Sequence, residues 1–182
     1  MSEKQSPEQL VAELVSLLTV SRDGEDAFTA TIGAEAVKLE GGVRQADKVR
    51  AILDDGIPVL GHLGMLPQRV LEEGGYNKKG KSEDEIESLH EGALALQDAG
   101  CFAIVLESVI PAVATSLTEA LDIPTIGIGC GDHTCDGEIA VLTDVIGSYP
   151  WFVPPFATQR ANVATDISTA VKGYIDAVQR SA

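Results

Sequence analysis

The sequence is poor in aromatic and basic residues. Only 4% of its 182 residues are aromatic although 45% are hydrophobic, so the core must consist of aliphatic Val, Ile, Leu and Ala side chains. Lysine and arginine number 13 against 28 aspartates and glutamates, which gives a net charge of -15. Because binding a nucleic-acid backbone needs clustered Lys and Arg, we expect no nucleic-acid partner.

Cysteine and long apolar runs are also scarce. The three cysteines, Cys101, Cys130 and Cys135, are few and odd in number, which argues against a disulfide framework and indicates a reducing compartment. There is no run of about 18 apolar residues that would predict a membrane span. The segment Met1–Gln5 contains no hydrophobic signal region. We therefore expect a cytoplasmic globular protein without a membrane partner.

The length and hydrophobic content are sufficient for one domain with a real core, and we expect residues 1–182 to form a single domain. Residues 1–32 are predicted to form a divergent N-terminal helix and loop. The helix begins at Ser6, with Pro7 at its first position, and the loop runs from Ser21 to about Thr31. Residues 33–178 are predicted to contain repeated strand–helix units.

Short, continuously apolar segments alternate with amphipathic ones through the repeated region. We expect strands at Glu35–Leu39, Ile57–Gly61, Phe102–Leu106 and Pro124–Ile128, with Glu138–Leu142 as a further candidate. We expect helices at Val43–Asp54, from Ser82 to the residue before Gly100, at Pro111–Leu121 and at Thr165–Val178. This alternation predicts an α/β fold with a parallel sheet covered by helices.

Four polar side chains stand at the predicted carboxyl ends of strands, where such folds place their functional groups. Lys38 and Glu40 are two apart and should project from one face of their strand. Gly41 and Gly42 should let the chain turn sharply after them and let a ligand come close to the backbone. Glu107 follows a very apolar strand, so partial desolvation would suit it to act as a general base. The alternatives are an ordinary ion pair for Lys38 and Glu40, a helix-capping role for Glu107, and a structural, hydrogen-bonded role for His62.

The glycine-rich segment Gly127–Gly131 suggests two further interpretations. A dinucleotide-binding loop is disfavoured, because a helix would have to open at these glycines and the sequence continues as a loop. A zinc site built from Cys130, His133 and Cys135 is also disfavoured. Three ligands within six residues lack the separated pairs of zinc sites, and no fourth ligand is nearby.

Several separate motifs resemble the ketopantoate hydroxymethyltransferase (3-methyl-2-oxobutanoate hydroxymethyltransferase) family, in the family's order. The motifs are Val37-Lys38-Leu39-Glu40-Gly41-Gly42, Gly61-His62-Leu63-Gly64, Gly74-Gly75-Tyr76, Val105-Leu106-Glu107-Ser108, Gly127-Ile128-Gly129-Cys130-Gly131, Cys135-Asp136-Gly137-Glu138 and Pro154-Pro155-Phe156. The resemblance runs from about Gly33 to Val178. Each motif is weak alone, and together they are specific.

The resemblance implies a (β/α)8 barrel of the phosphoenolpyruvate/pyruvate superfamily. It implies transfer of a hydroxymethyl group from 5,10-methylenetetrahydrofolate to 3-methyl-2-oxobutanoate, giving 2-dehydropantoate in pantothenate biosynthesis. Mg²⁺ would chelate the 2-oxo acid and stabilise the enolate. Carried over by motif, Glu40 would be a metal ligand, Lys38 would hold the substrate oxygen, and Glu107 would accept the proton. His62 is a possible supporting residue.

The sequence also departs from the family. The family's Gly-Asp-Ser and Asp-Leu-Pro motifs, which carry its metal-binding aspartates, do not occur among these 182 residues. With four or five strands we expect a partial, N-terminally truncated barrel that lacks the first strands. A half-barrel exposes its sheet edges, which favours association with another copy. The resemblance also implies a homo-oligomer, because members of the family form them.

Three hypotheses therefore stay open. The first is an active member that obtains its missing ligands from another chain or from a local rearrangement, with Asp23 or Asp26 as the nearby acids. The second is a catalytically impaired, truncated paralogue or interaction fragment. The third is another 2-oxo-acid enzyme of the same superfamily.

Overall fold

The computed structural model describes residues 35–69 and 74–180 of the chain. The chain divides into two compact units, Met1–Glu138 and Ile139–Ala182, and each is described by itself. The helix expected after Ser6 and the loop up to Thr31 lie outside the described residues. The expectation of a single domain stays a prediction.

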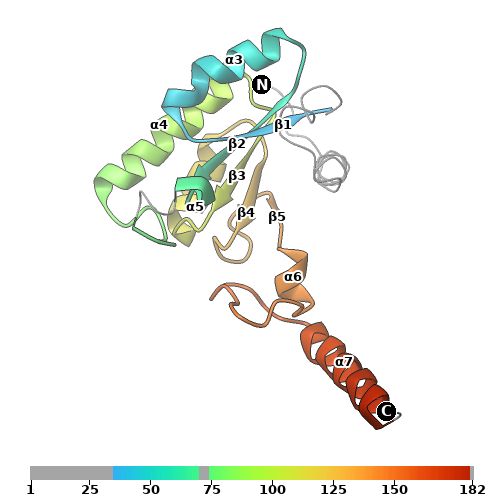
Figure 1. The fold of residues 1–182 in the computed structure, drawn as a ribbon. Coiled ribbons are helices and arrows are strands. Elements are labelled where there is room, and N and C mark those ends of the chain that lie inside the picture. The colour runs from blue at the N-terminus through green and yellow to red at the C-terminus, as the bar shows by residue number, and fades with distance from the viewer. Residues whose placement is uncertain (1–34, 70–73, 181–182) are drawn as a thin grey trace. The chain divides into compact units, whose positions relative to one another are not determined.

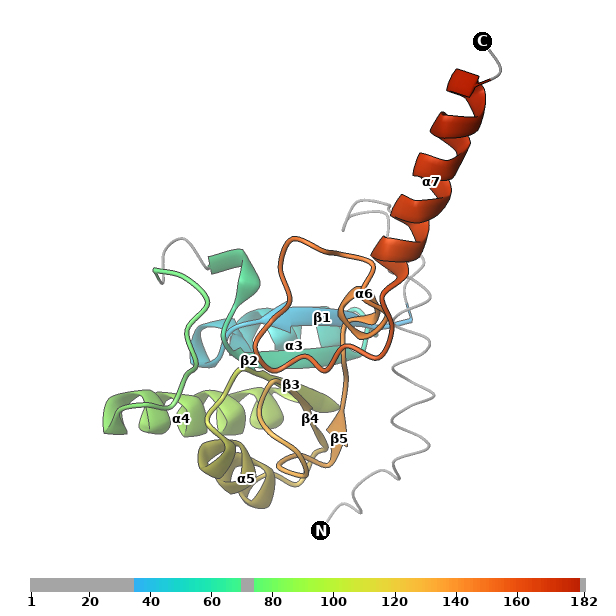
Figure 2. The same ribbon diagram turned by 90° about the horizontal axis from the view of Figure 1, so that it is seen from below.

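The first unit contains a five-stranded, entirely parallel sheet (Figure 2). Its strands are β1 (Val37–Glu40), β2 (Val59–Gly64), β3 (Ala103–Glu107), β4 (Thr125–Ile128) and β5 (Gly137–Glu138). Each strand pairs with the next one along the chain, which is the order found in a (β/α)8 barrel. A doubly wound sheet would reverse its order at a switch point. The predicted α/β class with parallel βα repeats is confirmed.

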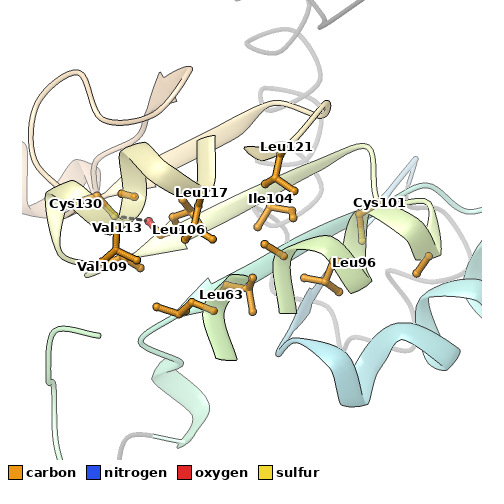
Figure 3. Close-up of a cluster of buried hydrophobic side chains, with 14 of the residues drawn as sticks. Leu63, Leu96, Cys101, Ile104, Leu106, Val109, Val113, Leu117, Leu121 and Cys130 are labelled. Atoms are coloured by element: carbon orange, nitrogen blue, oxygen red, sulfur yellow. Dashed lines mark hydrogen bonds between the residues drawn. The ribbon is translucent and has the colours of Figure 1, made fainter. Parts of the chain in front are cut away.

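The helices of this unit lie together on one side of the sheet (Figure 1). They are the 3₁₀ turn η2 (Val43–Gln45), α3 (Ala46–Asp54), α4 (Glu83–Ala99) and α5 (Pro111–Ala120), and a further 3₁₀ turn, η3 (Pro67–Arg69), follows β2 along the chain. The core between helices and sheet is aliphatic (Figure 3). Val49, Leu96 and Leu117 come from α3, α4 and α5, and all three are fully buried with Ile104 and Leu106 of β3.

The opposite face of the sheet carries a second set of side chains. Successive residues of a strand point to opposite faces, so the neighbours of Ile104 and Leu106 point away from the helices. Leu60, Val105 and Ile126 lie on this face and are buried as well. Apolar side chains on both faces explain why the strands are continuously hydrophobic rather than alternating.

The strand bounds differ from the predictions by one residue in β3 and β4 and by more in β1, β2 and β5, with β1 beginning at Val37 instead of Glu35. β2 begins at Val59 rather than Ile57, because the Ile57 N–H bonds to the Ile52 carbonyl at the end of α3 and Pro58 has no N–H. The strand then continues to Gly64, so His62 lies inside it. The candidate strand Glu138–Leu142 is reduced to the two residues of β5, and Leu142 instead begins the short helix α6 (Leu142–Val145).

The second unit ends in α7 (Val163–Arg180), which confirms the helix predicted over Thr165–Val178. Main-chain bonds from Val163 to Ile146 and from Ala164 to Gly147 fix the start of α7 against the end of α6. The apolar side chains of α7 remain about half exposed. Within residues 35–69 and 74–180, no helix combines the length and the apolar character that a membrane span requires.

The start of α4 is fixed by side-chain caps, as its Ser-Glu-Asp-Glu sequence predicts. The hydroxyl of Ser82, the N-cap residue, accepts a hydrogen bond from the Glu85 N–H at 3.3 Å. The Glu85 carboxylate accepts from the N–H groups of Gly80 at 3.0 Å and Lys81 at 2.7 Å. The hydrogen bond from Lys81 is the main reason why the pKa of Glu85 is lowered. The cap thus fixes both the helix and the loop that leads into it.

Ser82→Ala should lower the free energy of unfolding by about 1 kcal/mol, because it removes one cap of an otherwise unpaired helix N–H. The measurement is urea unfolding of the purified chain, followed by circular dichroism. Ser88→Ala is the matched control, since Ser88 is an exposed interior residue of the same helix. It should change stability by at most about 0.5 kcal/mol, in the stabilising direction. Equal destabilisation by both variants would contradict the capping role.

Candidate active site at the carboxyl ends of three strands

The register of the first three strands brings the four predicted site residues together on one face. Glu40 of β1 lies directly beside His62 of β2, and Lys38 is two residues earlier on β1. Val105 lies beside His62 on β3, and Glu107 is two residues further along. Residues two apart share a face, so all four side chains project from the side of the sheet opposite the helices.

The imidazole of His62 is the centre of this group and is only 1% exposed. Its Nδ1 lies 3.1 Å from the ammonium of Lys38 and 3.5 Å from Glu40 Oε1. The Lys38 ammonium also lies 3.5 Å from Glu40 Oε1. An ammonium carries only donors, so Lys38 donates to Nδ1 and that nitrogen acts as the acceptor. This hydrogen bond leaves the ring proton of a neutral His62 on Nε2.

The other ring nitrogen faces the predicted base. His62 Nε2 lies 3.2 Å from Glu107 Oε2, but the two are not aligned for a hydrogen bond, and Nε2 has no other hydrogen-bond partner in the described part of the chain. A buried N–H without an aligned acceptor costs about 1–3 kcal/mol, which makes this atom unusual. Nε2 is therefore positioned to bond either to Glu107 after a small shift or to a bound ligand.

The backbone around Glu107 is shaped by two residues in left-handed conformations. Gly64 has a φ of 99°, and a Cβ there would overlap the carbonyl oxygen of Glu107, which accepts from the Met65 N–H at 2.8 Å. Ser108 has a φ of 52°, which is uncommon for a residue other than glycine. The sequence alone did not indicate Ser108 as special. The left-handed conformation of Ser108 turns the chain out of the strand direction immediately after Glu107. The Glu107 side chain is 16% exposed.

Of the two glycines after β1, Gly41 has the predicted role and Gly42 has a different one. Gly41 has a φ of 115° and permits the expected sharp turn. A Cβ on Gly42 would meet the Cα of Gly92 at 2.9 Å, so Gly42 permits close approach of α4 rather than of a ligand. A cavity of about 650 Å³ opens beside this turn, but none of the four site residues lines it. The four side chains therefore form a group separate from this cavity.

The described residues alone do not form a metal site. Among them, no group of three or more His, Cys, Asp or Glu side chains is placed to hold a metal ion. Glu40, the predicted ligand, already lies beside the Lys38 ammonium. Mg²⁺ prefers several oxygen ligands in octahedral geometry, and one carboxylate with a lysine partner does not supply them.

No helix opens at Gly127–Gly131, which agrees with rejecting a dinucleotide-binding loop.

A parallel βα sheet that gathers an ammonium, a buried imidazole and two carboxylates on one face defines an α/β protein with a candidate enzyme-type site. Comparison with known families gives the particular group. The model of the family described as ketopantoate hydroxymethyltransferase matches residues 20–182. The chain belongs to this family.

Curated relatives agree with this assignment. A 3-methyl-2-oxobutanoate hydroxymethyltransferase from Heliobacterium modesticaldum is 48% identical over 78% of this chain and 51% of its own length. Proteins of the same name from Pyrobaculum arsenaticum and Geobacter sulfurreducens are 44% and 42% identical, over 97% and 96% of this chain and 68% and 67% of their own lengths. The chain thus spans about half to two thirds of these relatives.

Among solved structures, the YdjI aldolase from Escherichia coli K12 aligns with a TM-score of 0.40 and 17% identity. The alignment covers 73% of this chain and 61% of that chain. At this TM-score the likeness carries no argument about the fold.

The tautomer of His62 can be measured directly. We expect a neutral imidazole with its proton on Nε2, because the Lys38 ammonium donates to Nδ1. Long-range ¹H–¹⁵N correlation spectra of the imidazoles at neutral pH should show this pattern for one of the three histidines. The signal should disappear in His62→Gln, which assigns it. In Lys38→Met the Nδ1 resonance should move, since its donor is gone. A ring proton on Nδ1 in the unaltered chain would contradict the arrangement.

Proposed function

We propose that this chain acts as a 3-methyl-2-oxobutanoate hydroxymethyltransferase. It would transfer the one-carbon unit of 5,10-methylenetetrahydrofolate to 3-methyl-2-oxobutanoate and form 2-dehydropantoate, a step of pantothenate biosynthesis. Family membership supports the reaction class. The observation that carries the proposal is the contact of His62 with Lys38 and Glu40 on one side and with Glu107 on the other.

The first chemical step is removal of a proton from C3 of the 2-oxo acid. Glu107 accepts this proton, and the electron pair of the broken C3–H bond moves toward the 2-oxo oxygen. The Lys38 ammonium, 43% exposed and on the same face, binds the oxygen on which negative charge develops. His62 Nε2 lies 3.2 Å from Glu107 Oε2, and after a small shift its N–H would bond to the Glu107 carboxylate and hold it in position. C3 then attacks the methylene carbon of the folate as the bond from that carbon to N10 breaks, and N10 takes up the proton that Glu107 accepted. Water then attacks the same carbon, the bond to N5 breaks, and N5 takes the proton that water loses, which releases 2-dehydropantoate and tetrahydrofolate.

A metal role for Glu40 is a separate part of the proposal. When bound, Mg²⁺ would supply Lewis-acid stabilisation of the enolate oxygen. Because Glu40 offers one carboxylate, the ion would need further oxygen ligands, supplied by residues outside the described ranges, by another copy of the chain, or by the substrate itself. We also propose that the chain forms a homo-oligomer in the cytoplasm, with a 2-oxo acid and a folate as its ligands.

Two other functions remain as alternatives. The incomplete donor set among the described residues favours a catalytically impaired paralogue or interaction fragment. Lys38 and Glu107 would equally serve another 2-oxo-acid enzyme of the superfamily, since enolate formation does not specify the electrophile. The impaired paralogue would catalyse neither proton removal from C3 nor hydroxymethyl transfer, whereas another 2-oxo-acid enzyme would catalyse the proton removal alone.

Exchange of the C3 proton separates them. The purified chain with 3-methyl-2-oxobutanoate and Mg²⁺ in deuterated water should exchange the C3 proton for deuterium, measured by proton NMR. Glu107→Gln should slow the exchange about 10²–10⁴-fold, because it removes the proton acceptor. Glu87→Gln is the matched control, since Glu87 is exposed on α4, and it should exchange at the unaltered rate.

The outcomes are distinct. Exchange followed by 2-dehydropantoate formation when 5,10-methylenetetrahydrofolate is added supports the proposed function. Exchange without product supports a 2-oxo-acid enzyme with another electrophile. No exchange at high protein concentration, with and without Mg²⁺, overturns the catalytic proposal and leaves the impaired paralogue.

A further inference from the structure

A pair of cysteines lies close together on the face of the sheet that the helices cover. Cys130 is buried, 1% exposed, and belongs to the aliphatic core, and the partly buried Cys135 packs against the same core. A Cβ on Gly127 would meet Cys135 Sγ at 3.1 Å and Cys130 Cβ at 3.7 Å. Gly127 therefore provides the space in which the two thiols meet, and four residues separate the cysteines along the chain. Both cysteines are reduced.

The surroundings of the pair stabilise a negative charge on one sulfur. The Cys130 thiol donates to the Leu106 carbonyl at 3.0 Å (Figure 3), and it can donate instead to Cys135. The hydrogen bond from Cys130, helped by the hydroxyls of Thr134, Thr118 and Thr125, lowers the pKa of Cys135 to about 6 against the opposing effect of burial. The same hydrogen bond and burial raise the pKa of Cys130.

Cys135 can also be reached by a small reagent. It lines a cavity of about 140 Å³ together with Gly131, Thr134 and Gly137. Cys101 offers the contrast within the same chain. It is 2% exposed, and burial raises its pKa to about 11. A thiol with a low pKa and access to solvent is the kind that oxidants attack, whereas a buried protonated thiol is inert.

We propose that Cys135 is a peroxide-sensitive thiol and that Cys130 converts its oxidised form into an intramolecular disulfide. In the first step the Cys135 thiolate attacks one oxygen of hydrogen peroxide. The O–O bond breaks, and Cys135 sulfenic acid and hydroxide are formed. In the second step Cys130 loses its proton to the departing hydroxyl and attacks the Cys135 sulfur. A disulfide and water are formed, so peroxide is reduced and two thiols are oxidised.

The disulfide would remove a hydrogen bond to β3, the strand that carries Glu107. Reduced Cys130 donates its proton to the carbonyl of Leu106, the residue immediately before Glu107. A disulfide has no such proton, so the carbonyl would lose this hydrogen bond. The loop Gly129–Cys135 and the end of β3 would therefore be linked through the redox state of one sulfur.

The full chain can be tested in its native form. It is treated with hydrogen peroxide, remaining thiols are blocked with N-ethylmaleimide, and the protein is cleaved before aspartate. Cleavage at Asp98, Asp122, Asp132 and Asp136 places Cys101, Cys130 and Cys135 in three separate peptides. Mass spectrometry should find the Cys130 and Cys135 peptides joined and the Cys101 peptide blocked by N-ethylmaleimide. A reductant added before blocking should restore all three free thiols.

Two variants and one rate measurement complete the test. Cys130→Ala should stop the reaction at the sulfenic acid, which dimedone then labels on Cys135. Cys101→Ala, the matched control, should still form the Cys130–Cys135 disulfide. In the unaltered chain at pH 7, iodoacetamide should label Cys135 at least about 100-fold faster than Cys101, because far more of it is thiolate. Equal labelling rates, disulfides only between chains, or oxidation at Cys101 first would overturn the proposal.

Discussion

The buried imidazole of His62 is the group around which the site is organised. A polar ring that is 1% exposed needs partners, since burial of an unpaired polar group costs about 1–3 kcal/mol. Both neighbouring strands provide charged groups. β1 brings Lys38 and Glu40 to one ring nitrogen, and β3 brings Glu107 to the other. A one-residue change of register would turn either set of side chains to the helix-covered face. The aliphatic packing that fixes the register therefore also fixes the site.

That packing depends on small residues where elements approach closely. Gly61 faces Leu96 and Ile104, with its Cβ position at 3.0 and 3.2 Å from their side chains, so a larger residue would force those side chains to shift. Gly42 and Gly92 allow η2 and α4 to touch through their backbones. With only four phenylalanines and one tryptophan in the chain, the core gains its area from many aliphatic contacts and not from a few large rings. Close backbone approach maximises such contacts.

The sequence predicted the helices and strands, and the face on which the candidate site residues lie, better than the contacts between side chains. Alternation along β1 was enough to place Lys38 and Glu40 on one face, and the apolar run before Glu107 was enough to place it at a strand end. The position of His62 inside β2 was missed, because the strand continues past Gly61 to Gly64, where it pairs with Leu106 and Glu107 of β3. The meeting of Cys130 with Cys135 could not be predicted either, since it depends on a loop that turns back over Gly127.

Two features that cost folding free energy help to decide between an active family member and a catalytically impaired paralogue. Ser108 holds a left-handed conformation directly after Glu107, which costs about 1 kcal/mol or more for a residue other than glycine. His62 Nε2 is buried without an aligned acceptor, at a similar cost. Neither feature improves the packing of the core, and a glycine or an apolar residue would remove each cost. Strain and unpaired donors concentrated beside one carboxylate are what a site prepared for a ligand requires. They favour the active family member over the impaired paralogue.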